Sequence, residues 1–440
     1  MQMLIWPLIL EQVLAITIGL VDTIMVSSVG EAAVSGVSLV DMVNVLIINI
    51  FAALATGGAV VVAQLLGARE RERGCGAAKQ LLFVVTLISL LITALVLLFR
   101  APILRLLFGA IEDDVMQSAL TYLTISAFSY PVLALYNAGA ALFRAQGNSR
   151  VSMLIAGLVN VINIGGNALL IYGFRWGVAG AALASLFSRA AGAVAILLLL
   201  RDPSHEISIS RGERFHPDGA LIGRILNIGI PNGLENSLFQ LGRVLVVSII
   251  ALFGTTQIAA NAIANNLDGV GIIPGQAINL AMITVVGQCV GAGDAAQARR
   301  MAKKLVKITY LILGGTCLLT ILLCPLILKI YNLSPETLRL ARTLVLIHNG
   351  CAILLWPVSF TLTNALRAAG DVRYPMVCAI ASMMLIRLGG GYVLAVQFGL
   401  GAIGIWIAMV GDWLCRTICF TVRFAGNKWL SFAPELQKTE

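Results

Sequence analysis

Charged residues are scarce in this chain. Only 12% of its 440 residues are Asp, Glu, Lys or Arg, whereas 59% are hydrophobic. A soluble domain cannot bury that much apolar surface, so the composition excludes an ordinary water-soluble protein. Apolar runs long enough to cross about 30 Å of hydrocarbon recur along the whole length. The sequence therefore predicts an all-α integral membrane protein.

Groups that usually carry enzyme chemistry are also rare. The chain has three histidines, and its eight cysteines show no metal-ligand spacing. Cys415 and Cys419 share a helix face, which is typical of packing inside a bundle. There is no nucleophile–base pair and no phosphate-binding glycine loop. We expect no enzyme activity, no structural metal, no cofactor and no disulfide framework.

The two halves of the chain repeat each other. A shift of 224 residues aligns their landmark residues, and one residue less aligns Arg144-Ala145-x-Gly147 with Arg367-Ala368-x-Gly370. A repeat this long in so apolar a chain is typical of a transporter with two lobes that alternate access. The landmark pairs are Pro7/Pro231, Glu11/Glu235, Gly30/Gly254, Gln64/Gln288, Gly177/Gly401 and Gly180/Gly404.

Twelve membrane spans are expected, six in each half. With six spans, each half begins and ends on the same side, so an axis along the membrane normal relates two pseudo-symmetric lobes. We expect an N-terminal lobe at 1–200, a cytoplasmic linker at 201–223, a C-terminal lobe at 224–428 and a cytoplasmic tail at 429–440. The approximate spans are 4–26, 33–66, 78–99, 115–143, 151–173, 178–200, 224–252, 257–290, 305–328, 338–365, 374–396 and 401–424.

The net charge of +9 is distributed unevenly. Basic residues gather in the loops after even-numbered spans, as in 69–73 and 299–307, and in the linker. Because Lys and Arg favour cytoplasmic loops, both termini should be cytoplasmic in a multi-pass protein of the inner (plasma) membrane. The charge has no interleaved aromatic residues, so it does not indicate nucleic-acid binding.

Asp22 is the strongest functional candidate among the ionisable residues inside the spans. It lies in Gly19-Leu20-Val21-Asp22-Thr23, late in the first span, with apolar residues on both sides. Ionisable groups in a bilayer are costly and usually functional. A carboxyl group that loads and releases a proton as access alternates is the simplest coupling device. The alternative is a structural acid that is hydrogen-bonded to Thr or Asn on a neighbouring helix.

A cluster of amides on the fifth span could support this acid. Asn163 and Asn167 are four residues apart and share a helix face, Asn160 lies one turn earlier, and Ser185 on the sixth span adds a hydroxyl. Amide oxygens can hold a protonated carboxyl or help to coordinate Na⁺. The alternative is ordinary hydrogen bonding between helices. The cluster lacks a second acid, which favours H⁺ over Na⁺.

A second polar set lies on the first two spans of each half. Asp41-x-x-Asn44 matches Asn265-x-x-Asp268 with the acid swapped. Such acids could give a substrate cavity a negative lining suited to organic cations. Alternatively, Glu235 and Asp268 form buried ion pairs with arginines in the spans. The candidate cavity residues are Glu11, Asp41, Asn44, Gln64, Glu235, Asn265, Asp268 and Gln288.

Arginines within the spans have structural explanations. Arg243 and Arg387 are the partners considered for the acids above. Asp412 and Arg416 are one helical turn apart, so we expect them to pair with each other or with Arg387. Arg387 and Asp412 are therefore predicted to form structural ion pairs.

These motifs form an ordered set that resembles the multidrug and toxic compound extrusion (MATE) family. It opens with Pro7-x-x-x-Glu11, Gly19-Leu20-Val21-Asp22-Thr23 and Val29-Gly30-Glu31. Pro231-x-x-x-Glu235 with Gly254-Thr255 repeats the opening, and Ile386-Arg387-Leu388-Gly389 with Asp412 is similar to the DinF-like branch. The resemblance covers nearly the whole chain.

The resemblance implies twelve helices in two six-helix lobes that form a V. It also implies export of organic, often cationic, compounds against inward H⁺ or Na⁺, with Asp22 as the proton-coupling acid. Some members carry Asn and then Asp where this chain has Asn163 and Asn167, and this departure weakens a Na⁺ site. The expected partners are small organic substrates and the bilayer, and the protein is expected to be a monomer. A flippase for lipid-linked saccharides, from the same superfamily, remains the alternative function.

Overall fold

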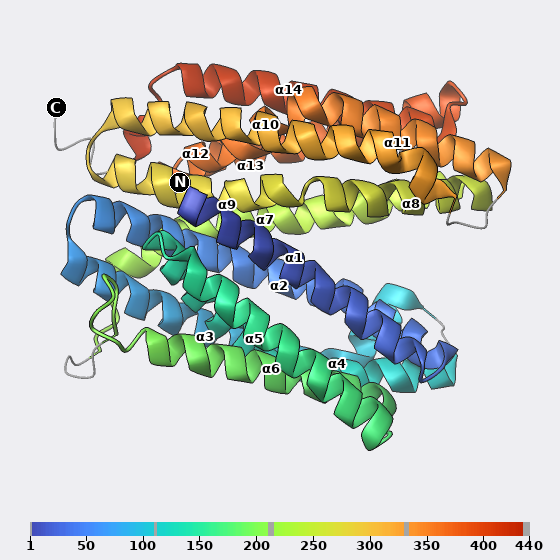
Figure 1. Cartoon of the computed structure of the whole chain (residues 1–440), viewed down its shortest axis with the longest axis horizontal. Coiled ribbons are helices and arrows are strands. Elements are labelled where there is room, and N and C mark those ends of the chain that lie inside the picture. The colour runs from blue at the N-terminus through green and yellow to red at the C-terminus, as the bar shows by residue number, and fades with distance from the viewer. Residues whose placement is uncertain (1, 110–111, 210–214, 330–333, 434–440) are drawn as a thin grey trace. The chain divides into compact units, whose positions relative to one another are not determined.

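The computed structural model describes residues 2–109, 112–209, 215–329 and 334–433 (Figure 1). Residues 210–214 of the predicted linker and 434–440 of the predicted tail lie outside these ranges. Every regular element within them is a helix, and twelve of these helices are long and apolar enough to span a membrane. The predicted all-α membrane fold with twelve spans is confirmed.

The chain divides into two compact units, which we call unit 1 (Met1–Gly233) and unit 2 (Leu234–Glu440). The boundary falls inside helix α7, Gly219–Ala251. In unit 1, α2 packs on α4, α4 on α6 and α1 on α5. The elements of unit 1 that precede α7 are α1 (Gln2–Ser27), α2 (Glu31–Gly67), α3 (Arg71–Phe108), α4 (Asp113–Ala145), α5 (Ser149–Asn167), the π-helix η1 (Ala168–Gly173) and α6 (Gly177–Leu199).

Unit 2 has the same order of spans with more interruptions. Helix α8 packs on α11, and α14 packs on α11 and on the π-helix η3. Its elements after α7 are α8 (Thr255–Gly271), α9 (Ile273–Gly291), α10 (Ala295–Leu328), α11 (Pro335–Trp356), η2 (Pro357–Leu362), α12 (Thr363–Ala368), α13 (Arg373–Ser382), η3 (Met383–Gly390), η4 (Val393–Gln397), α14 (Gly401–Ala425) and the short η5 (Leu430–Phe432).

The predicted span 257–290 is interrupted rather than continuous. It consists of α8 and α9, which meet at Ile272, two residues before Pro274. Proline lacks the backbone N–H and its ring crowds the preceding turn, so the helix breaks there. The repeat-related α2 of unit 1 contains no proline and runs unbroken for 37 residues.

The glycines that mark the repeat have a structural role. Gly30 precedes α2 with φ 140°, and Gly254 precedes α8 with φ 93°. A side chain is strained at such backbone angles, whereas glycine adopts them freely. The same sharp entry into the second helix of each unit therefore requires glycine at both positions.

Two arginines hold the chain that follows the last span of each unit. Arg71 of α3 donates from Nε to the Glu206 carbonyl at 2.8 Å and from Nη2 to the His205 carbonyl at 2.7 Å. Arg299 of α10 donates from Nη1 to the Phe424 carbonyl at 2.9 Å and from Nη2 to the Gly426 carbonyl at 2.7 Å. Part of the basic charge in these loops is therefore used for internal anchoring.

Candidate functional site

Asp22 and the asparagines of α5 come together in unit 1. The Asn167 amide donates a hydrogen bond to Asp22 Oδ1 from a residue 145 positions away in the chain. Asn167 Nδ2 also lies 3.4 Å from Asn163 Oδ1, and Asn163 donates to the Ser185 hydroxyl at 3.2 Å. Asn160 instead donates to the backbone carbonyl of Ala156 at 2.8 Å. The helices α1, α5 and α6 thus build one polar chain around a single carboxyl group.

A second carboxyl group lies near this chain. Asn44 of α2 donates to Asp41 at 3.3 Å and accepts from the Tyr130 hydroxyl of α4 at 2.9 Å. Arg189 of α6 donates to the Ser129 hydroxyl at 2.8 Å and interacts electrostatically with both Asp41 and Asp22. Arg189 is an ionisable residue within a span, but neither it nor Ser129 and Tyr130 of α4 is among the predicted site residues, because their partners lie on other helices.

Glu11 forms a buried ion pair in unit 1. Arg144, in the last turn of α4, places Nη1 2.6 Å from Glu11 Oε1, and the Ser152 hydroxyl of α5 donates to Oε2 at 2.6 Å. Gln64, another predicted cavity residue, is buried and accepts a hydrogen bond from Arg224 of α7. Both side chains are therefore engaged with arginines of their own unit.

Glu235 forms the corresponding pair in unit 2. Arg367 Nη2 of α12 lies 2.7 Å from Glu235 Oε2. The expectation that Glu235 pairs with Arg243 or Arg387 names the wrong arginine, because the side chain on α7 points to the end of the fourth span of its unit. The repeat in the sequence indicates the correct partner, because Glu11 and Arg144 recur as Glu235 and Arg367 with shifts of 224 and 223 residues.

Asp268 of α8 has an imidazole and an amide as partners. His348 Nδ1 of α11 lies 3.3 Å from Asp268 Oδ1, and Asn349 donates to the same oxygen at 2.6 Å. The rings of Trp406 and Trp413 pack on His348 with centroid distances of 5.8 and 5.0 Å. The expected partners Arg243 and Arg387 are again wrong, since α11 is the helix that packs on α8.

The two remaining cavity candidates of unit 2 lie on α8 and α9. Asn265 is exposed on α8 and donates to the Asn261 carbonyl at 2.8 Å. Gln288 is half-buried on α9. The candidates of unit 2 therefore have different partners: Glu235 pairs with Arg367, Asp268 contacts His348 and Asn349, and Asn265 bonds to its own helix.

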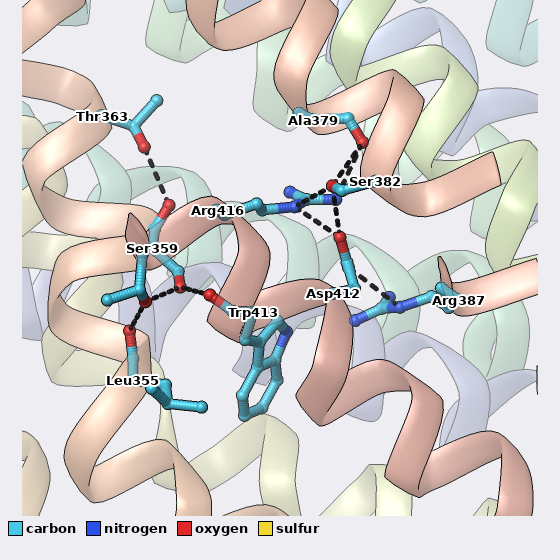
Figure 2. Close-up of polar contacts among 10 residues, drawn as sticks. Leu355, Ser359, Thr363, Ala379, Ser382, Arg387, Asp412, Trp413 and Arg416 are labelled. Atoms are coloured by element: carbon cyan, nitrogen blue, oxygen red, sulfur yellow. Dashed lines mark hydrogen bonds and ion pairs between the residues drawn. The ribbon is translucent and has the colours of Figure 1, made fainter. Parts of the chain in front are cut away.

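A compact charged cluster lies between α13, η3 and α14 (Figure 2). Asp412 Oδ1 accepts from Arg416 Nε at 2.8 Å and from the Ser382 hydroxyl at 2.5 Å. Arg387 Nε lies 3.3 Å from Asp412 Oδ2. Asp412 is completely buried, and the two arginine side chains are 3% and 7% exposed. The structure places Arg387 and Asp412 together, with Arg416 as the better-bonded partner.

In the described part of the chain, no group of three His, Cys, Asp or Glu side chains is arranged to hold a metal ion. All eight cysteines are free thiols.

Comparison with known proteins identifies the class to which this fold and these sites belong. The MatE family matches residues 7–169 and 231–393, two segments that start 224 residues apart and together exceed half of the chain. The chain belongs to the MatE family, the multidrug and toxic compound extrusion (MATE) transporters. Proteins of this family are multi-pass membrane transporters of small organic compounds and are not enzymes.

Individual relatives agree with this assignment. The "Uncharacterized transporter YisQ" of Bacillus subtilis is 27% identical over 97% of this chain and 94% of its own length. The "Probable multidrug resistance protein NorM" of Thermotoga maritima is 26% identical over 96% of this chain and 91% of its own length. These relatives do not favour the flippase alternative.

Solved structures show the same fold. One is described as the "Outward-facing conformation of a multidrug resistance MATE family transporter of the MOP superfamily". It matches with a TM-score of 0.89 and 21% identity over 96% of this chain and 94% of that chain. Another, "Crystal structure of MATE in the bent conformation", matches with a TM-score of 0.88 and 22% identity over 99% and 95%.

Proposed function

We propose that this protein is a secondary active antiporter that exports organic compounds, mainly organic cations, in exchange for H⁺ by alternating access. The observation that carries the proposal is the environment of Asp22. This carboxyl group is hydrogen-bonded by the neutral amide of Asn167, whereas Glu11 and Glu235 each face a guanidinium at 2.6 and 2.7 Å. An arginine balances the charge of each glutamate, whereas the neutral amide of Asn167 does not balance the charge of Asp22.

The amide is able to serve both protonation states. Asn167 Oδ1 is buried and has no hydrogen-bond partner among the described residues. An asparagine carries both a donor and an acceptor, so a rotated amide can accept the proton of a neutral Asp22. Asn167 therefore supports a carboxyl group that alternates between charged and neutral forms.

Charge counting supports exchange of one positive charge. Asp22 and Asp41 together carry one more charge than Arg189 balances. In a bilayer, such an excess is costly until a cation compensates it. One proton on Asp22 or one organic cation nearby would each restore neutrality, so the two compete for the same negative charge. Competition of this kind is the minimal basis of antiport.

Coupling to H⁺ is preferred over Na⁺ for this site. A Na⁺ ion requires several oxygen ligands, whereas Asn163 Oδ1 and the Ser185 hydroxyl already accept hydrogen bonds, which leaves Asn167 Oδ1 and the single carboxyl group of Asp22. We further propose that the protein acts as a monomer in the inner (plasma) membrane with both termini cytoplasmic. The basic loops after even-numbered spans support that orientation. The multidrug names of relatives such as NorM support a broad range of substrates.

Ethidium transport tests the proposal. Purified protein is reconstituted into liposomes, ΔpH and Na⁺ gradients are imposed separately, and dye movement is followed by fluorescence. We expect ΔpH to drive transport in the wild type and Asp22→Asn to abolish it. Asp114→Asn is the matched control, because Asp114 is an exposed acid in the first turn of α4.

Two results would reject the proposal. One is transport by Asp22→Asn at the wild-type rate under ΔpH. The other is transport that a Na⁺ gradient alone drives and that ΔpH does not affect. Size-exclusion profiles of each variant in detergent separate loss of coupling from loss of folding.

A further inference from the structure

Arg387 is a buried cation that lacks adequate partners. Its side chain is 7% exposed, and it donates no hydrogen bond to any residue in the described part of the chain. Its Nε–H is fully buried and unpaired, because Asp412 Oδ2 at 3.3 Å is outside good hydrogen-bond geometry. A guanidinium has five N–H donors and does not lose its proton in proteins. Buried charges normally have partners, so Arg387 requires an explanation.

Asp412 does not fully balance the charge of Arg387, because it is shared with Arg416. Arg416 donates to Asp412 Oδ1 at 2.8 Å, to the Ser382 hydroxyl at 3.1 Å and to the Ala379 carbonyl at 3.2 Å. Nε and Nη2 of Arg416 therefore both donate hydrogen bonds, and Arg416 contacts Oδ1, the oxygen of Asp412 that accepts hydrogen bonds. Two guanidinium groups share one negative charge, which leaves an excess of one positive charge.

A residue of helix α7 increases the excess of positive charge around Asp412. Arg243 of α7 forms no ion pair with a described residue and repels Arg387 electrostatically. The Phe239 ring lies 5.2 Å from the Arg387 guanidinium carbon and 5.6 Å from that of Arg416. A cation–π contact contributes about 0.5–2 kcal/mol and cannot replace a counter-ion.

The local backbone and the repeat point to the same place. Arg387 lies in the π-helix η3, and π-helical turns occur frequently at functional sites. Under the shift of 224 residues, Arg387 corresponds to Asn163, a member of the polar chain around Asp22. Unit 2 therefore carries a cation at the position where unit 1 carries part of its proposed proton site.

We propose that Arg387, assisted by Arg243, binds the carboxylate of an exported organic anion or zwitterion. The carboxylate supplies the missing negative charge and accepts the unused guanidinium N–H groups in a bidentate arrangement. Phe239 provides an aromatic face beside it. Only the direction of transport in this proposal rests on the proposed function, since binding of the carboxylate can be measured without any gradient.

Two planar dyes of opposite charge test the site on the purified full-length protein. Fluorescence polarisation reports binding of carboxyfluorescein, an organic anion, and of ethidium, an organic cation. We expect Arg387→Gln to weaken carboxyfluorescein binding at least about tenfold, which corresponds to 1.4 kcal/mol, and to leave ethidium binding unchanged. Arg387→Lys, which keeps the charge, should restore part of the affinity. Arg339→Gln, at an exposed site on α11, is the control for loss of a positive charge.

The alternative outcomes are decisive. Equal binding of carboxyfluorescein by the wild type and Arg387→Gln, no binding of it by either, or equal loss of both dyes would overturn the proposal. Displacement of carboxyfluorescein by chloride at the same concentration as acetate would also overturn it, because the site would then hold an inorganic ion. If Arg387→Gln fails to fold, the exposed Arg243→Gln should still lower carboxyfluorescein affinity severalfold, and an unchanged affinity would count against the site. Failure of ΔpH-driven ethidium transport with Arg387-dependent binding intact would reject the antiport proposal alone.

Discussion

The two units share one scaffold and differ in the charge that they bury. Each unit pairs the glutamate of its first span with the arginine at the end of its fourth span, Glu11 with Arg144 and Glu235 with Arg367. Duplicated packing at these positions has kept duplicated ion pairs. The repeat therefore preserves the contacts that set how the helices of a unit pack.

The polar interiors have diverged. Asp22 of unit 1 corresponds to Val246 of unit 2, so the proposed proton site has no counterpart there. Asn163 corresponds to Arg387, which sits beside Asp412 in a cluster with excess positive charge. Asp41 and Asp268 occupy swapped positions of one motif. The comparison teaches that a membrane scaffold can be duplicated while the two copies acquire opposite polarity.

The largest expected difference between the units is the loss of stability when one partner of the glutamate–arginine ion pair is removed. Removing one partner of a buried pair costs about 3–5 kcal/mol because a charge is left unpaired. Glu11 retains a hydroxyl donor from Ser152 at 2.6 Å, whereas Glu235 has the ion pair with Arg367 and no hydrogen bond to a described residue. We expect Arg367→Met to destabilise the protein more than Arg144→Met, with both measured as the monodisperse fraction left after heating in detergent.

A double variant controls this experiment. Glu235→Gln combined with Arg367→Met removes both charges and should recover much of the stability. Equal losses for the two single variants would contradict the difference between the units.

Close helix contacts give the next largest effect. A Cβ at position 57 would lie 2.6 Å from the Ile225 carbonyl oxygen, a rigid backbone atom. A Cβ at position 242 would meet the end of the Met383 side chain, which can move aside. Overpacking costs about 1–3 kcal/mol, so Gly57→Ala should lie near the upper limit and Gly242→Ala near the lower.

The same heating assay ranks these variants. Gly315→Ala in α10, where nothing lies within 4 Å of a new Cβ, is the control and should be neutral or stabilising. A larger loss for Gly242→Ala than for Gly57→Ala would show that side-chain mobility does not decide the cost.

A third change tests the proposed preference of unit 1 for H⁺ over Na⁺. Asn167→Asp places a second carboxylate in direct contact with Asp22 and raises the negative charge of the polar chain. We expect Na⁺ to bind at least about tenfold more tightly, a gain of 1.4 kcal/mol, and to drive ethidium export that the wild type does not show. Isothermal titration with Na⁺ and flux under a Na⁺ gradient measure this. Unchanged indifference to Na⁺ would mean that ligand geometry, not charge, excludes the ion.

The smallest effect concerns single amides. Asn349 donates to the carboxylate of Asp268 at 2.6 Å, whereas Asn163 donates to the neutral Ser185 hydroxyl at 3.2 Å. Hydrogen bonds to charged groups contribute about 1.5–3 kcal/mol and neutral ones about 0.5–1.5 kcal/mol. Asn349→Leu should therefore lower thermal stability more than Asn163→Leu. The reverse order would indicate that His348 alone holds Asp268.

Much of the candidate site could be predicted, and the failures share one cause. The pairing of Asp22 with Asn167 could be expected because few polar groups lie at that depth in the spans. The pairing of Asp412 with Arg416 followed from helical spacing alone. The partners of Glu235 and Asp268 were wrong because several arginines were plausible, and spacing along the chain does not rank residues on different helices.

The sequence by itself determined the helices, their number and their order in two repeats. Apolar length fixes a span because the bilayer leaves the backbone no other way to satisfy its hydrogen bonds. Glycine fixes the entry to α2 and α8 because only glycine tolerates their φ values. Only the tertiary structure decided which charges meet. A buried pair such as Glu11 and Arg144 joins residues 133 positions apart, and its formation depends on how each helix is rotated against its neighbours, which packing of the whole unit sets.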